Sequence, residues 1–138
     1  MDGEFDQAIA AFNRGHYFEA AERFEHAPGD AGAGSEVHEM AGALGRVAAA
    51  LHLRFERGGR QAAVNLLSQA LLMLEDFRPV RAGVDVERLC AELTAMADEI
   101  RASPREEREG LRYRARLFVE RRRAPKIKRT NEAGAVRG

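Results

Sequence analysis

Residues 12–25 read Phe-Asn-Arg-Gly-His-Tyr-Phe-Glu-Ala-Ala-Glu-Arg-Phe-Glu, and this stretch decides the fold. Apolar residues recur at helical spacing up to Phe12, and Gly15 then interrupts the pattern where a helix C-cap with positive φ is comfortable. A second short helix follows, with an apolar stripe made of Tyr17, Ala20, Ala21 and Phe24. The stretch therefore predicts a helical hairpin that turns at Gly15.

Three more helices are expected before residue 102. Ser35 is a predicted N-cap for a long helix that reaches Phe55 and ends at two glycines. A helix from about residue 60 to 77 is apolar on most sides, which predicts the most enclosed element of the fold. A fifth, amphipathic helix carries the stripe Val86, Leu89, Cys90, Leu93, Met96 and Ile100. Residues 1–102 are thus expected to form an all-α bundle of two helical hairpins plus a fifth helix.

The C-terminal part of the chain, residues 103–138, is the basic part. A capping-box pattern with Pro at the first helical position begins at Ser103, so a sixth, basic helix is expected within residues 103–123. Residues 111–119 also alternate apolar residues with Arg, a strand pattern, and we favour helix while leaving strand open. Residues 124–138 are polar with little periodicity and are expected to form a disordered basic tail.

Composition favours a helical protein of a reducing compartment. Ala, Leu, Glu and Arg dominate, while Val, Ile and Thr are sparse. The lone Cys90 excludes an intrachain disulfide, and the N-terminus lacks the basic and apolar run of a signal peptide. No segment approaches the roughly 18 apolar residues of a membrane span. We expect a cytoplasmic protein that does not contact a membrane.

A net charge of zero conceals a strong asymmetry along the chain. Residues 1–100 hold nine Arg, no Lys and 17 acidic residues, whereas residues 101–138 hold 13 basic and five acidic residues. The two parts therefore carry −8 and +8. Such asymmetry is typical of a contact with nucleic acid or an acidic partner, but the basic arm could equally fold back on its own acidic body, and we favour the second interpretation.

Three segments of the chain resemble the domain-of-unknown-function 309 family, small all-helical bacterial and archaeal proteins without an established activity. These are residues 12–22, similar to the family signature Phe-Asn-x-Gly-x-Tyr-x-Glu-x-His-Glu, residues 47–52, and residues 83–89. The resemblance spans roughly residues 5 to 100 and implies the same helical fold. Ala21 stands where the family signature has His, and Pro28 where the family usually continues to a Trp.

Acidic residues on the second helix form the first candidate site. Glu19, Glu22 and Glu25 recur every three residues, and His52 corresponds to a His that the family also has. Glu and His at helical spacing can bind metal in helical bundles, which suggests a degenerate metal-dependent hydrolase-like site. A solvated helix face is the favoured interpretation, because Ala21 removes the second nitrogen ligand. No catalytic residue and no cofactor are predicted.

Basic residues near the C-terminus form the second candidate site. They could follow a phosphate backbone or bind an acidic partner, while a neighbouring aromatic ring stacks on a base. The candidate residues are Arg112, Arg114, Arg116, Arg121, Arg122, Arg123, Lys126, Lys128 and Arg129. The leading expectation is a non-enzymatic interaction or assembly module that binds a protein partner or itself, with nucleic-acid binding through this segment as the alternative.

Overall fold

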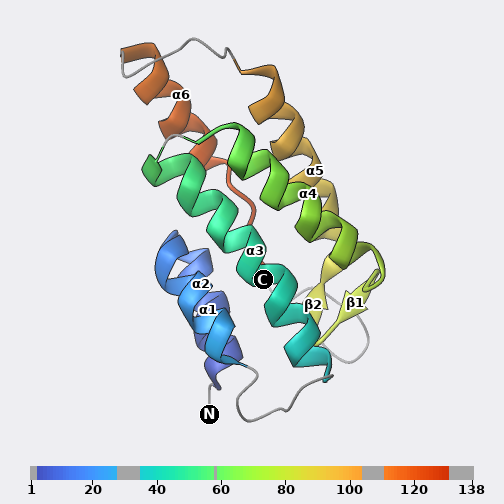
Figure 1. Ribbon diagram of the computed structural model, residues 1–138. Helices are drawn as coiled ribbons and strands as arrows, with labels where there is room; N and C mark the ends of the chain where they lie inside the picture. Colours follow the sequence, from blue (N-terminus) through green and yellow to red (C-terminus); the bar gives the residue numbers. More distant parts are fainter. Residues whose placement is uncertain (1–2, 28–34, 58, 104–110, 131–138) are drawn as a thin grey trace.

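The computed structural model describes residues 3–27, 35–57, 59–103 and 111–130, and these form an all-α fold with one very small sheet (Figure 1). The prediction of an all-α bundle is confirmed. Its elements are α1 (Glu4–Asn13), α2 (Tyr17–His26), α3 (Glu36–Arg57), α4 (Gln61–Glu75), β1 (Val80–Arg81), β2 (Val84–Asp85), α5 (Val86–Ala102) and α6 (Leu111–Arg122).

The first hairpin forms as its sequence predicts. Helix α1 ends at Asn13, and Gly15 adopts a φ of +83° that allows the chain to reverse before α2. The backbone N–H of Gly15 donates to the Phe12 carbonyl at 2.9 Å. Across the turn, the rings of Phe12 and Tyr17 meet edge to face with centroids 5.2 Å apart. The turn and the aromatic pair hold α1 and α2 antiparallel.

Helix α3 is the centre of the fold. It lies between the α1–α2 hairpin and the α4–α5 pair, and α6 also contacts it (Figure 1). Ser35 caps its start, because the Ser35 Oγ accepts a hydrogen bond from the His38 N–H at 3.1 Å. The expectation that α4 would be the most enclosed helix is wrong. Helix α4 packs chiefly on α3 and α5, which leaves its outer side in solvent and Leu72 77% exposed.

A short hairpin between α4 and α5 is absent from the sequence prediction. Strands β1 and β2 pair antiparallel around Ala82 and Gly83, which have φ values of 51° and 73°. Positive φ at both central residues is the geometry of the type I′ turn, one of the two turns common in two-residue hairpins. The Asp85 carboxylate then caps α5 by accepting a hydrogen bond from the Arg88 N–H at 3.0 Å.

Residues 123–130, which we call the C-terminal strap, follow α6 and run back along the body of the protein. The strap lies beside β2: the Asp85 N–H donates to the Lys128 carbonyl at 2.9 Å, and the Thr130 N–H donates to the Gly83 carbonyl at 2.7 Å. Ile127 is only 2% exposed. The prediction of a disordered tail is thereby corrected for residues 124–130, because an apolar anchor and backbone pairing offset the entropy of ordering them. Residues 131–138 lie outside the described residues.

The prediction of a sixth helix is confirmed over Leu111–Arg122, so the strand alternative for residues 111–119 does not apply. Its predicted start at residues 104–110 lies outside the described residues. Helix α6 and the strap together bring the basic end of the chain across the bundle.

Replacing Asn13 with Ala should loosen the strap. The Asn13 side chain makes two hydrogen bonds to the backbone of Ile127. Its Oδ1 accepts from the Ile127 N–H at 2.8 Å, and its Nδ2 donates to the Ile127 carbonyl at 3.0 Å. Loss of both bonds should cost about 1–3 kcal/mol of local stability. Amide hydrogen exchange in residues 124–130 should then accelerate several-fold, as measured by mass spectrometry. Asn65→Ala, which removes an exposed side-chain bond to Gln61, is the control and should leave that exchange unchanged.

Candidate functional site

Of the three glutamates of the predicted acidic site on α2, Glu19 lines one pocket with His52, whereas Glu22 and Glu25 do not. Glu19 is engaged by two arginines, with its Oε2 3.1 Å from the Arg23 Nε and 3.8 Å from the Arg14 Nη2. Glu22 and Glu25 are exposed. His52 on α3 packs against Phe18, with ring centroids 5.2 Å apart and ring planes tilted by 50°. Within the described part of the chain no three His, Cys, Asp or Glu side chains come together as metal ligands would, so the hydrolase-like hypothesis gains no geometric support.

Cys90 on α5 is fully buried, as its position on the apolar stripe predicts. Burial raises the pKa of its thiol, and the nearby Arg78 guanidinium only partly opposes this effect. A thiol with a raised pKa and no exposure is a poor nucleophile. Cys90 therefore belongs to the core and not to a site.

Several of the predicted basic residues bind the protein's own body. Arg121 extends from α6 to the first hairpin, where it donates to the Gly15 carbonyl at 3.1 Å and to the Glu56 carboxylate at 3.0 Å. Its guanidinium also lies 5.9 Å from the ring centroid of Tyr17. The basic arm folds onto the acidic body, which was the favoured interpretation of the charge asymmetry.

The strap repeats this arrangement along α1. The Arg129 Nη1 lies 2.7 Å from the Asp6 Oδ1, and its guanidinium is 5.5 Å from the centroid of the Phe5 ring. The Lys126 Nζ donates to the Asn13 carbonyl at 2.8 Å. Arg116, on α6, is half-buried and also has an interaction partner. These cations hold the C-terminal part of the chain in place and are not available to a separate ligand without releasing it.

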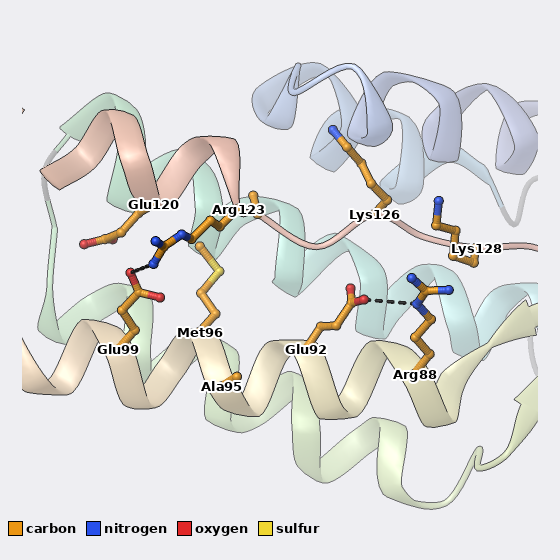
Figure 2. A pocket seen from close by; sticks show the side chains of 10 residues that line it. Arg88, Glu92, Ala95, Met96, Glu99, Glu120, Arg123, Lys126 and Lys128 are labelled. Atoms are coloured by element: carbon orange, nitrogen blue, oxygen red, sulfur yellow. Dashed lines mark hydrogen bonds and ion pairs between the residues drawn. The ribbon is translucent and has the colours of Figure 1, made fainter. Parts of the chain in front are cut away.

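A groove of about 420 Å³ separates α5 from the strap (Figure 2). Cationic and acidic side chains alternate along it. Figure 2 shows Arg88 paired with Glu92 at 3.1 Å and Arg123 approaching Glu99 at 3.9 Å, while Lys126 and Lys128 extend from the strap at one end. The Arg88–Glu92 pair lies within α5, and Arg123–Glu99 joins the strap to α5 across the groove. Because carboxylates neutralise both arginines, the groove does not form an open anion site.

A buried ion pair fixes the inner side of α6. The Arg54 Nε and Nη2 each donate to one oxygen of the Glu120 carboxylate, both at 2.8 Å, and each side chain is 2% exposed. Bidentate geometry of this kind is the strongest form of charge-assisted hydrogen bond between side chains. Glu120 is the only carboxylate of α6, so the pair leaves the rest of the helix without a negative charge.

The opposite side of α6 carries the exposed residues, and we call it the α6 outer face. Because an α-helix has 3.6 residues per turn, the residues of this face all lie on one side of the helix, opposite Glu120. Leu111 is 86% exposed, Phe118 62% and Val119 41%. The arginines among them are also exposed, and the Arg122 guanidinium lies 5.7 Å from the Phe118 ring centroid. The α6 outer face consists of Leu111, Arg112, Arg114, Ala115, Phe118, Val119 and Arg122.

A second surface feature, which the sequence interpretation missed, lies between α2 and α3. It is a hollow of about 350 Å³ with mostly small apolar residues on its walls. We call it the α2–α3 hollow; its lining residues are Ala21, Phe24, Glu25, His38, Ala41, Gly42, Gly45, Arg46 and Ala49. Small residues on two adjacent helices were the available signal: Ala21 on α2, and Gly42, Gly45 and Ala49 on α3.

Comparison with known proteins adds no assignment. No protein-family model matches the chain, and no curated protein and no solved structure is similar to it. The resemblance to the domain-of-unknown-function 309 family therefore stays a prediction. In the part of the chain that the structure describes, no helix has the length and apolar character needed to cross a membrane.

Proposed function

We propose that this protein is a non-enzymatic assembly module that binds a second copy of itself through the α6 outer face. One observation carries the proposal: α6 is held on its inner side by the buried Arg54–Glu120 pair and presents apolar residues flanked by arginines on its outer side. The helix is thus fixed in place while its outer face has no covering segment among the described residues.

The composition of the α6 outer face is that of a protein interface. Exposed apolar patches rimmed by polar residues commonly mark interaction sites, and aromatic residues and Arg are enriched at interface cores. Burying the Phe118 side chain would contribute roughly 1.5–3 kcal/mol through removal of its apolar surface from water. Because α6 is already ordered, association would not have to include the cost of folding it.

Charge favours a second copy as the partner. Among the described residues, Arg112, Arg114 and Arg122 have no acidic neighbour on the outer face, so a partner surface that supplies carboxylates would complement them. Residues 1–100 of the same chain carry a net charge of −8, and Glu22 and Glu25 remain exposed on α2. The basic helix of one copy can therefore meet the acidic body of another.

Phe118→Glu should abolish self-association. The substitution places a carboxylate at the centre of the apolar face. Because Phe118 is exposed, folding should be unaffected. Light scattering should show the mass of the unaltered chain rising with concentration and the mass of the Phe118→Glu chain staying at that of one chain. Leu72→Glu on α4 is the matched control, because Leu72 is also a strongly exposed apolar residue, and it should associate like the unaltered chain. Equal association by the Phe118→Glu chain would refute the proposal.

Single-stranded nucleic acid is the competing partner, since Phe118 could stack on a base while the arginines contact phosphates. The acidic body would repel such a ligand, whereas it attracts the α6 of another copy. The same two chains therefore also go into a mobility-shift assay with a single-stranded oligonucleotide at low salt, where no shift is expected. A shift that Phe118→Glu abolishes, together with a single-chain mass for the unaltered protein, would assign the α6 outer face to nucleic acid.

A further inference from the structure

We infer that the α6 outer face of one copy docks into the α2–α3 hollow of the next, so that assembly is head-to-tail. The inference rests on the proposed function, self-association through α6, and names its acceptor. It is carried by the shape of the hollow, by the charges at its rim and by the position of α6 on its own chain.

The hollow suits an aromatic side chain. Gly42 and Gly45 contribute no side chain to its walls, and the neighbouring alanines contribute only methyl groups. A Cβ on Gly45 would lie 3.5 Å from the Phe24 Cβ, so α2 and α3 are in close contact beneath the hollow. The result is an apolar concavity on a rigid two-helix base. Phe118, 62% exposed at the middle of the α6 outer face, is the side chain with the matching chemistry.

A carboxylate at the rim is complementary to the arginines around Phe118. Glu25 lines the hollow, and Glu22 lies one helical turn before it; both are exposed, and neither has an ion-pair partner in the described part of the chain. The two cationic candidates at the rim are His38 and Arg46, and the Arg46 Nη1 is directed back to the Gly42 carbonyl of its own helix at 3.3 Å. The rim thus offers the Glu25 carboxylate to the arginines that flank Phe118, and α2 carries a second exposed carboxylate, Glu22, one helical turn away.

A symmetric contact between two α6 outer faces would be repulsive, because it would place cations against cations. It would bring Arg112, Arg114 and Arg122 of one copy against the same three residues of the other, with no carboxylate on either face, since Glu120 is buried. Like charges brought together at an interface are unfavourable and commonly exclude a pairing. A heterologous contact avoids this repulsion.

The fold prevents α6 from filling the hollow of its own chain. Glu120 ties α6 to Arg54 near the C-terminal end of α3, and Arg121 ties it to Gly15 just before α2 begins. The hollow is lined by Phe24, near the C-terminal end of α2, and by residues 38–49 of α3. Figure 1 shows that this end of α2 points away from α6. Within the described ranges, each copy therefore has one donor surface and one acceptor surface that its own elements leave uncovered, an arrangement that forms rings or open chains.

Mixing two blocked chains tests the inference. Phe118→Glu removes the donor surface and keeps the hollow, whereas the double variant Glu22→Arg/Glu25→Arg replaces the α2 carboxylates at and next to the hollow with cations and keeps α6. Both changes are at exposed positions, and circular dichroism checks that each chain is folded. Each chain alone should sediment as a monomer. An equimolar mixture should form a one-to-one dimer and stop there, because only one donor and one acceptor remain.

The outcomes separate the inference from the proposed function. If Glu22→Arg/Glu25→Arg associates like the unaltered chain while Phe118→Glu does not, α6 mediates assembly but the hollow is not its acceptor. The same conclusion follows if both variants are monomers and their mixture stays monomeric. If the unaltered chain is a monomer at every concentration, the proposed function itself fails.

Discussion

Glu120→Ala is expected to lower the free energy of unfolding by about 3–5 kcal/mol, the usual cost of leaving one partner of a buried ion pair unpaired. The substitution leaves the Arg54 guanidinium, 2% exposed, without the carboxylate that accepts its two 2.8 Å hydrogen bonds. It also releases the inner side of α6. Urea unfolding followed by circular dichroism measures the change.

Replacing both partners is the matched control. In Arg54→Met/Glu120→Leu no charge remains in the interior, and an apolar pair of similar volume is commonly neutral or even stabilising. The double variant should therefore unfold within about 1 kcal/mol of the unaltered chain or at higher urea. If Glu120→Ala is as stable as the unaltered chain, the pair is not buried and α6 does not lie where the structure places it.

Ile127→Ala is expected to lower the free energy of unfolding by about 2–4 kcal/mol, because it removes a fully enclosed apolar side chain and leaves a cavity. Ile127 is the apolar anchor of the strap and is 2% exposed. The change should also speed hydrogen exchange in the strap. Urea unfolding gives the global effect, and exchange measured by mass spectrometry gives the local one.

Val119→Ala serves as the comparison, since it shortens a β-branched side chain on α6 that is 41% exposed. Its effect should stay within about 0.5 kcal/mol. If Ile127→Ala lowers the free energy of unfolding no more than Val119→Ala does, residues 124–130 do not pack on the body. In that case the disordered tail expected from the sequence would be the correct description.

Local signals predicted the helical frame well. Gly15 marked the turn of the first hairpin, Ser35 the start of α3, and the spacing from Val86 to Ile100 the buried stripe of α5. Each of these features depends on residues within a few positions of one another. Hydrophobic periodicity and helix-capping rules predict such features because they depend only on residues close together in sequence.

Features that depend on distant partners were not predictable. Ile127 is an isolated apolar residue in a polar stretch, and its partner Asn13 is 114 positions away. Glu120 stands among arginines like a solvated residue, yet it is buried against Arg54, 66 positions away. The β1–β2 hairpin is similarly hidden, because only two residues form each strand and Ala82 gives no sign of its positive φ.

The candidate surface was only partly visible in the sequence. The arginines of residues 112–129 were recognised as one group, but the fold divides them into cations bound by the body, such as Arg121 and Arg129, and cations left in solvent, such as Arg114. The helical spacing of Leu111, Phe118 and Arg122 was the signal for a continuous outer face. Strand-like alternation over the same residues obscured it.

Sedimentation equilibrium of the unaltered chain, over a wide range of concentrations and at low and high salt, tests the proposal of self-association most directly. The account predicts a weight-average mass that rises from one chain past two chains as concentration increases, because head-to-tail contacts do not close at the dimer. High salt should weaken this association by screening the arginine–carboxylate contacts. A mass that stays at one chain at every concentration and salt would contradict the account.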